Sequence, residues 1–153
     1  MLNKSKTKEL IVKFTKKGDP LELAEIERVT EVKILGVIFD DKLTFKSHIN
    51  FVKQRITTRI YLLLRLKRLG YSKIELSYLY QSLVTTVMTY CCSVWGGAAN
   101  YLLDELDGCQ KKAVRFGFID NFKPIRQHIK ESDQRIFDEM INIGTAIHYI
   151  CLF

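Results

Sequence analysis

The stretch VKILGVIFDDKLTFKSHI, from Val32 to Ile49, decides the fold of this chain. Its first part, Val32 to Phe39, is mostly β-branched or aromatic and is too short and too continuous for an amphipathic helix, so it predicts a buried strand. Gly36 interrupts the run, and a glycine inside a strand marks a bulge, a close packing contact or the approach of a ligand. The two aspartates that follow predict a turn leading into a helix.

The residues before this stretch predict a small sheet. Glu9 to Phe14 and Leu21 to Ile26 are typical of strands, and the breakers Gly18 and Pro20 lie between them. The connections are too short for parallel crossovers, so we expect about three strands that pair antiparallel.

The residues after this stretch predict a helical bundle, because apolar side chains recur every three or four positions. Ser72 with Glu75 forms a capping-box pattern at the start of the second helix. The expected helices cover 46–69, 73–94, 101–116, 124–131 and 133–149. We therefore expect an α+β fold with an antiparallel sheet domain at 1–44 and a bundle of four to five helices at 45–153.

The formal net charge of +7 is unevenly distributed. The segment from Lys42 to Arg68 contains eight basic residues and no acidic one, whereas the two signs nearly balance elsewhere. A localised basic element is typical of proteins that bind a polyanion, either nucleic acid or an anionic membrane surface. A solvated helix face is the alternative, since basic residues in a last helical turn also stabilise the helix dipole.

The four cysteines predict neither disulfides nor a zinc site. Cys91, Cys92, Cys109 and Cys151 form no C-x-x-C pair, and no histidine stands at zinc-ligand spacing from them. We expect reduced, buried thiols, no metal or cofactor, and a cytoplasmic or nuclear location.

A membrane span is the less favoured interpretation of the uncharged stretch from Leu76 to Leu103. It is long enough to cross a bilayer, but its many hydroxyl and amide side chains and its Gly96-Gly97 pair disfavour insertion. Met1 to Lys8 is polar and basic and has no apolar core of a signal peptide. We expect a helix buried in a protein core and no membrane partner.

Four segments in order carry a family resemblance: NKSKTKELIVKF, IERVTEVKILGVIFDDKLTFKSHINFVKQRI, LYQSLVTTVMTYCCSVWGG and LDGCQKKAVR. Together they resemble the C-terminal part of reverse transcriptases from non-LTR retrotransposons of the LINE or jockey type, over roughly Asn3 to Arg115. The resemblance implies the end of the palm, then the primer grip at Leu35-Gly36-Val37, then the thumb. It makes Lys6 a candidate palm lysine.

The resemblance also implies a ligand. A primer grip and thumb would hold an RNA–DNA hybrid or other duplex weakly and by its backbone, without sequence preference. The nucleic-acid-binding residues that we predict are Leu35, Gly36, Val37, Lys42, Lys46, Lys53, Arg55, Arg59, Arg65, Lys67 and Arg68.

The same resemblance places the magnesium-binding carboxylates of the parent polymerase before the matched region. Asp40 and Asp41 instead match the turn between primer grip and thumb, so we expect them to serve turn geometry. We therefore expect a fragment of a retroelement polymerase that is not an enzyme by itself. Its partners would be nucleic acid and, if encoded upstream, the polymerase palm. The alternative is a co-opted protein-interaction module with an exposed apolar surface, for which self-association is possible.

Overall fold

The computed structural model describes residues 7–13, 18, 21 and 26–142 and divides the chain into two compact units, Met1–Phe51 and Val52–Phe153. The α+β class and the helical bundle are confirmed. Lys6 and Cys151 lie outside the described residues, as does most of the strand expected at 21–26.

The described residues of the first unit form two small sheets. Strand β1 (Lys8–Leu10) pairs in parallel with β2 (Glu27–Val29), and β3 (Glu31–Ile34) pairs antiparallel with β4 (Val37–Asp40). The expectation of antiparallel pairing throughout is therefore wrong for β1 and β2. Their parallel pairing is possible because 16 residues separate them, enough for a crossover that the predicted turn did not anticipate.

The expected single strand from Val32 to Phe39 is also wrong, because it is a hairpin. Leu35 and Gly36 have φ values of 47° and 90° and form the two-residue loop between β3 and β4. Positive φ at both central positions is the geometry of a type I′ turn, whose twist matches that of the strands beside it.

Helix α1 (Lys46–Arg68) has the predicted amphipathic pattern. Val52, Ile56, Ile60 and Leu63 are buried in the second unit, and Gly70 follows the helix with a positive φ of 92°. The spacing of three or four residues therefore gives α1 one apolar face toward the bundle.

The expected helix over 73–94 is broken. It consists of α2 (Lys73–Tyr80), a π-helical turn (Gln81–Thr85), α3 (Thr86–Thr89) and α4 (Cys92–Trp95). Cys91 adopts a left-handed conformation with φ 50°, and the Trp95 indole donates to the Tyr90 carbonyl at 2.9 Å. The break therefore lets the buried Trp95 indole N–H find a hydrogen-bond acceptor.

The capping box of Ser72 and Glu75 is confirmed.

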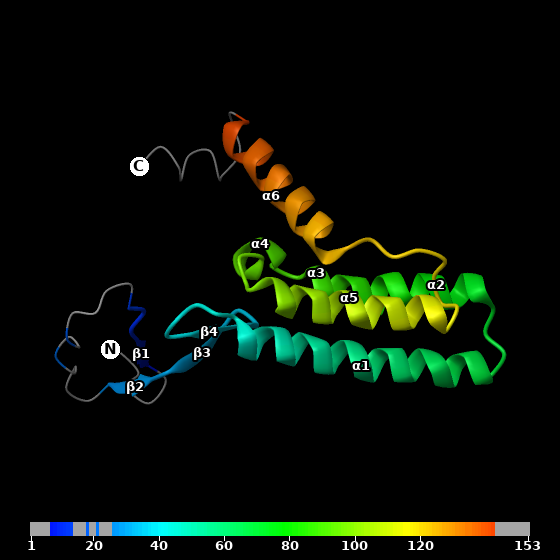
Figure 1. The fold of residues 1–153 in the computed structure, drawn as a ribbon, viewed down its shortest axis with the longest axis horizontal. Helices are drawn as coiled ribbons and strands as arrows, with labels where there is room; N and C mark the ends of the chain where they lie inside the picture. Colours follow the sequence, from blue (N-terminus) through cyan, green and yellow to red (C-terminus); the bar gives the residue numbers. More distant parts are fainter. Residues whose placement is uncertain (1–6, 14–17, 19–20, 22–25, 143–153) are drawn as a thin grey trace. The chain divides into compact units, whose positions relative to one another are not determined.

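Helices α5 (Asn100–Arg115) and α6 (Ile125–Ile141) follow in the bundle. Helix α6 runs continuously through Asp133, so the two helices expected there are wrong. In Figure 1, α1, α2 and α5 lie side by side, whereas α6 leaves them at an angle and contacts α3, α4 and α5.

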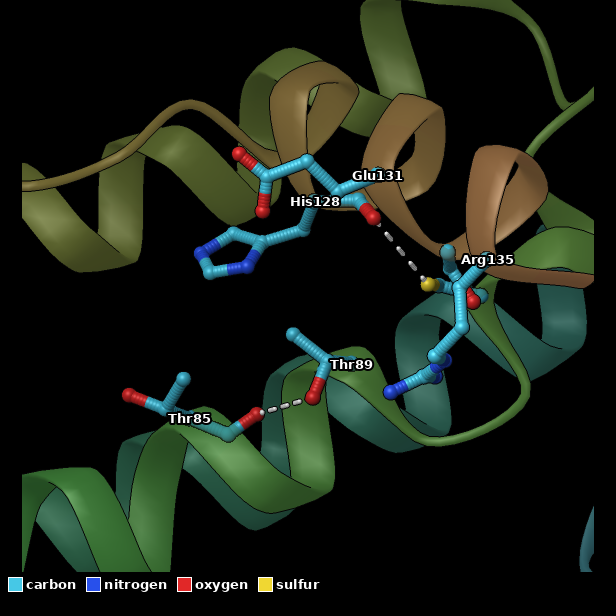
Figure 2. Close-up of a pocket in the computed structure, with 7 residues that line it drawn as sticks. Thr85, Thr89, His128, Glu131 and Arg135 are labelled. Atoms are coloured by element: carbon cyan, nitrogen blue, oxygen red, sulfur yellow. Dashed lines mark hydrogen bonds between the residues drawn. The ribbon is translucent and has the colours of Figure 1, made fainter. Parts of the chain in front are cut away.

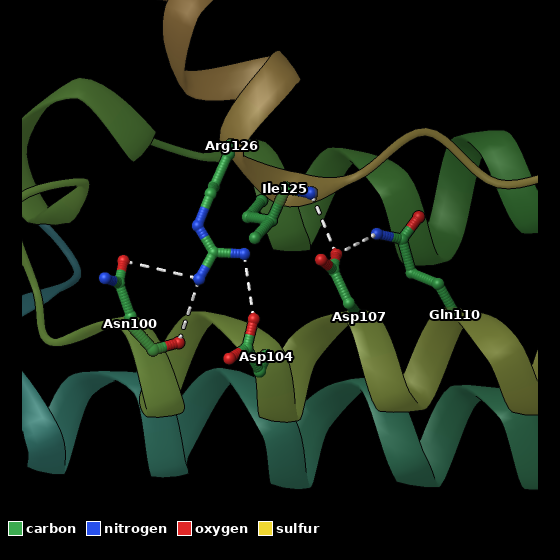
Figure 3. Close-up of polar contacts among 6 residues, drawn as sticks. All are labelled: Asn100, Asp104, Asp107, Gln110, Ile125 and Arg126. Atoms are coloured by element: carbon green, nitrogen blue, oxygen red, sulfur yellow. Dashed lines mark hydrogen bonds and ion pairs between the residues drawn. The ribbon is translucent and has the colours of Figure 1, made fainter.

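A polar cluster fixes the start of α6 on α5 (Figure 3). The buried Asp107 carboxylate accepts hydrogen bonds from the Ile125 backbone N–H at 2.8 Å and from the Gln110 amide at 3.1 Å. The Arg126 guanidinium pairs with Asp104 at 2.8 Å. Asp107 thus caps a helix that has no side-chain cap at its own Pro124.

The described residues contain no helix long and apolar enough to cross a bilayer.

Cys92 and Cys109 are buried, and burial raises the pKa of each thiol. Cys91 is exposed, so the prediction that it is buried is wrong. It lies at the helix break, where its backbone is left-handed.

Candidate nucleic-acid interface

Helix α1 presents a basic surface without a carboxylate of its own. Arg55, Arg65 and Arg68 are exposed, and Tyr61 between them is 61% exposed. These residues and the exposed Thr58 recur at spacings of three or four and lie opposite or beside the apolar stripe; we call them the exposed α1 face. Cations and hydroxyls along one helix face are groups that contact a phosphate backbone.

Three other predicted cations of α1 are bound within the bundle. The Lys53 ammonium lies 2.5 Å from the Glu105 carboxylate, and Arg59 donates to the Leu83 carbonyl at 2.5 Å. Lys67 donates to the Phe116 carbonyl at 2.6 Å. The basic residues of this helix therefore divide into those of the exposed α1 face and three that bind α5, the residue after it and the π-helical turn, of which Lys67 is also exposed. Sequence spacing cannot reveal that division, because it depends on partners 24 to 52 residues away.

Sequence reasoning did not select Tyr61 and Thr58. Their signal was available, because both fall on the same side of the helical wheel as Arg65. An exposed tyrosine offers a ring for sugar or base contact beside cations that contact phosphate.

The first unit contains the predicted primer-grip residues. Leu35 at the tip of the hairpin is 85% exposed, Gly36 is half-buried and Val37 is only 3% exposed. Lys42 and Lys46 are exposed near the start of α1. The hairpin turn thus presents the Leu35 side chain to solvent, whereas Val37 serves the core.

The Asp40 carboxylate accepts hydrogen bonds from the loop that follows it. One oxygen of its carboxylate accepts from the backbone N–H groups of Lys42 and Thr44 at 3.1 and 3.0 Å, and the other from the Thr44 hydroxyl and the Phe45 N–H at 3.1 and 2.8 Å. Burial alone would raise the pKa of Asp40, but these hydrogen bonds outweigh it and lower the pKa below its ordinary value.

This arrangement does not fit the magnesium that the resemblance implies for the parent polymerase. Both oxygens of Asp40 already accept two hydrogen bonds each. In the part of the chain that the structure describes, no three His, Cys, Asp or Glu side chains come close enough to hold a metal ion together.

A pocket of about 200 Å³ lies between α6 and the π-helical turn with α3, as Figure 2 shows. Its lining residues are Thr85, Thr89, Cys92, His128, Glu131, Ser132 and Arg135. Several of its polar groups bind one another: the Thr89 hydroxyl donates to the Thr85 carbonyl at 2.9 Å, and the Cys92 thiol lies 3.9 Å from the His128 carbonyl.

The side chains that line this pocket are suited to packing and not to catalysis. Burial, and then Lys123, lower the pKa of His128, while burial raises that of Cys92, so both are neutral at pH 7. A neutral buried thiol is a poor nucleophile. The volume also falls below that of most ligand pockets. We therefore assign this pocket to the joint between α6 and the bundle.

Comparison with known proteins gives one similarity to report. The chain is 25% identical over 123 residues to the "Probable RNA-directed DNA polymerase from transposon X-element" of Drosophila melanogaster, an alignment that covers 74% of this chain. The chain spans 13% of that protein. No family model matches the chain. No solved structure matches it either.

This similarity supports a relationship to reverse transcriptases, and it corrects one expectation. We expected a chain that is not an enzyme, but the protein it resembles is a polymerase, so that prediction is wrong as stated. The chain is similar in sequence to a transposon RNA-directed DNA polymerase.

Proposed function

We propose that this chain is the primer-grip and thumb region of a retroelement reverse transcriptase and binds nucleic acid by its backbone without sequence preference. The observation that carries the proposal is the exposed α1 face, where Arg55, Arg65 and Arg68 stand on a helix without a carboxylate. The ordered motif resemblance and the similarity to a transposon polymerase support it. A cytoplasmic or nuclear location belongs to the same proposal.

The hairpin supports the primer-grip part of the proposal. Leu35 occupies a left-handed position that suits glycine, asparagine or aspartate better, and its side chain is exposed. A strained residue at an exposed tip is a recurrent feature of functional sites. The duplex would approach this tip and the half-buried Gly36 beside it.

The test is binding of the full chain to an RNA–DNA hybrid duplex over a salt series. We expect the logarithm of the association constant to fall linearly with the logarithm of salt, with a slope of about 0.9 for each phosphate neutralised. Two hybrids of unrelated sequence should bind equally, because phosphate contacts carry no sequence information. Absence of binding at low salt, or affinity indifferent to salt, would refute the proposal.

A protein-interaction role is the second candidate, favoured by the exposed apolar side chains of Ile34 and Leu35 at the end of the hairpin. Adjacent exposed apolar residues mark interfaces. It predicts concentration-dependent self-association in sedimentation, which Leu35→Asn would reduce. A monomer at every concentration counts against it.

A further inference from the structure

A surface pocket of about 330 Å³ lies between α2 and the loop that follows α5. Its apolar lining comes from the buried Phe118 and Ile119 and from Ile74 and Tyr78, which are 69% and 73% exposed. Ile74 and Tyr78 are four residues apart in α2 and therefore share one helix face. Two large apolar side chains thus stand exposed beside a concavity that already has an apolar lining.

The pocket also has polar lining groups. Ser77 contributes to the lining, and Lys73 and Asp120 lie in it as an ion pair. Polar and apolar side chains thus line the pocket together, and its volume is at the lower end of the range for ligand sites. It suits one planar heterocycle better than a long polymer segment.

The segment leading into the pocket is positively charged. Lys67 donates to the Phe116 carbonyl, and the Arg115 guanidinium lies 5.6 Å from the centre of the Phe116 ring. The Phe116 ring in turn lies 5.9 Å from that of Phe118, which lines the pocket. Two cations are therefore close to the apolar lining.

The nearby carboxylates already have partners. Asp120 is paired with Lys73, and Glu75 accepts hydrogen bonds from the backbone N–H and hydroxyl of Ser72. A ligand that brings both a ring and a negative charge therefore matches this surface better than an uncharged or cationic one.

We propose that this pocket binds an unpaired nucleobase of a single-stranded polynucleotide, stacked against Tyr78, with the adjoining phosphates near Lys67 and Arg115. This inference rests on the proposed function, because it requires that the chain bind nucleic acid. It adds a second type of contact, since single-stranded bases are recognised by stacking on aromatic rings as well as by charge.

The test compares two probes and two variants of the full chain. The probes are a labelled single-stranded oligouridylate and a blunt RNA–DNA hybrid duplex. The variants are Tyr78→Ala and the control Tyr101→Ala, which removes a tyrosine of similar exposure, 57%, from outside the pocket. Tyr78→Ala should weaken binding of the single strand by about tenfold or more and leave the duplex unchanged. Tyr78→Phe should bind as the parent does, because the ring is retained.

Four results would overturn the inference. Equal single-strand affinity of Tyr78→Ala and Tyr101→Ala would show that the pocket takes no base. Normal single-strand binding by Tyr78→Ala together with lost self-association would assign the pocket to a second copy of the chain. If the duplex binds and the single strand does not, this inference is wrong but the proposed function stands. If neither probe binds, the proposed function is wrong as well.

Discussion

The Asp40 carboxylate holds the loop between β4 and α1 in a conformation that its residues disfavour. Leu43 and Phe45 have φ values of 50° and 56°, and a left-handed backbone costs a non-glycine residue about 1 kcal/mol or more. The backbone of Lys42, Thr44 and Phe45 donates to Asp40 and offsets that cost. One buried side chain therefore determines how the chain enters α1.

Asp40→Ala should lower the free energy of unfolding by about 2–4 kcal/mol, because it leaves the buried Phe45 N–H and the part-buried N–H groups of Lys42 and Thr44 without their acceptor. Asp41→Ala is the matched control: the hydrogen bonds that hold this loop are accepted by Asp40 and not by Asp41, so the loss of the Asp41 carboxylate should cost under about 0.5 kcal/mol. Urea denaturation of the three proteins measures the difference. Equal midpoints for the two variants would show that the Asp40 hydrogen bonds contribute nothing.

Asp40 also predicts a pH dependence. Its pKa is lower in the folded than in the unfolded chain, where it is near the ordinary value of 3.8. Its contribution to stability is therefore complete above pH 3.8 and is lost as the pH falls through the folded value. Urea midpoints of the parent should drop over this range, and those of Asp40→Ala should drop less. Parallel curves would contradict the assignment.

At the scale of helices and strands, Gly96 lets α4 and α6 pack closely. A Cβ atom at Gly96 would lie 2.6 Å from the Ile129 Cγ2 atom and 2.7 Å from the Cys92 carbonyl oxygen. Gly96→Ala should therefore destabilise the chain by about 1–3 kcal/mol. Gly97→Ala is the control, because its Cβ would meet nothing within 4 Å. Thermal unfolding compares them, and equal melting temperatures would rule out close packing as the reason for the glycine.

Asp107 should control the attachment of α6 through the contacts in Figure 3. Asp107→Ala removes the acceptor of the Ile125 N–H and should cost about 1–3 kcal/mol. Asp104→Ala breaks only the exposed pair with Arg126 and should cost under about 1 kcal/mol. Hydrogen exchange should show faster exchange in α6 than in α1 for the first variant. A uniform increase over both helices would contradict a local role.

The sequence predicted the elements whose signals are local. The extent of α1 followed from its apolar spacing and Gly70, and the start of α2 from the capping box. The hairpin was missed because leucine at a left-handed turn position gives no Asn-Gly signal. The break at Cys91 was missed because apolar periodicity continues across it, and Asp133 suggested a helix start although α6 continues through it.

The candidate interface was predictable to a similar degree. The helical wheel places Arg65 and Arg68 opposite the apolar stripe, and both are exposed. It could not reveal that Arg59 and Lys67 donate to backbone carbonyls of other elements, because such contacts arise only in the assembled bundle. The pocket beside Tyr78 depends in the same way on Phe118, which is 40 residues further along the chain.

For the whole molecule, we expect the cations of the exposed α1 face to contribute to nucleic-acid binding and the cations bound within the bundle to contribute to stability. Replacing the exposed set, Arg55, Arg65 and Arg68, by glutamine should reduce the salt slope of hybrid binding by about 2–3. The cost in stability should stay under about 1 kcal/mol, because interactions of exposed charged side chains are weakened by solvent. Replacing the bundle set, Lys53, Arg59 and Lys67, removes charged hydrogen bonds instead. It should cost about 1–3 kcal/mol and leave the slope nearly unchanged.

Both triple variants remove the same charge, so net charge alone predicts an equal loss of binding from each. Salt titrations of hybrid binding, paired with urea denaturation of the same samples, distinguish the two explanations. An equal fall in slope for the two variants would mean that the whole charge attracts the polymer and that no helix face is specialised. A fall confined to the exposed variant, with the stability loss confined to the other, would show that one helix uses its cations for two separate purposes.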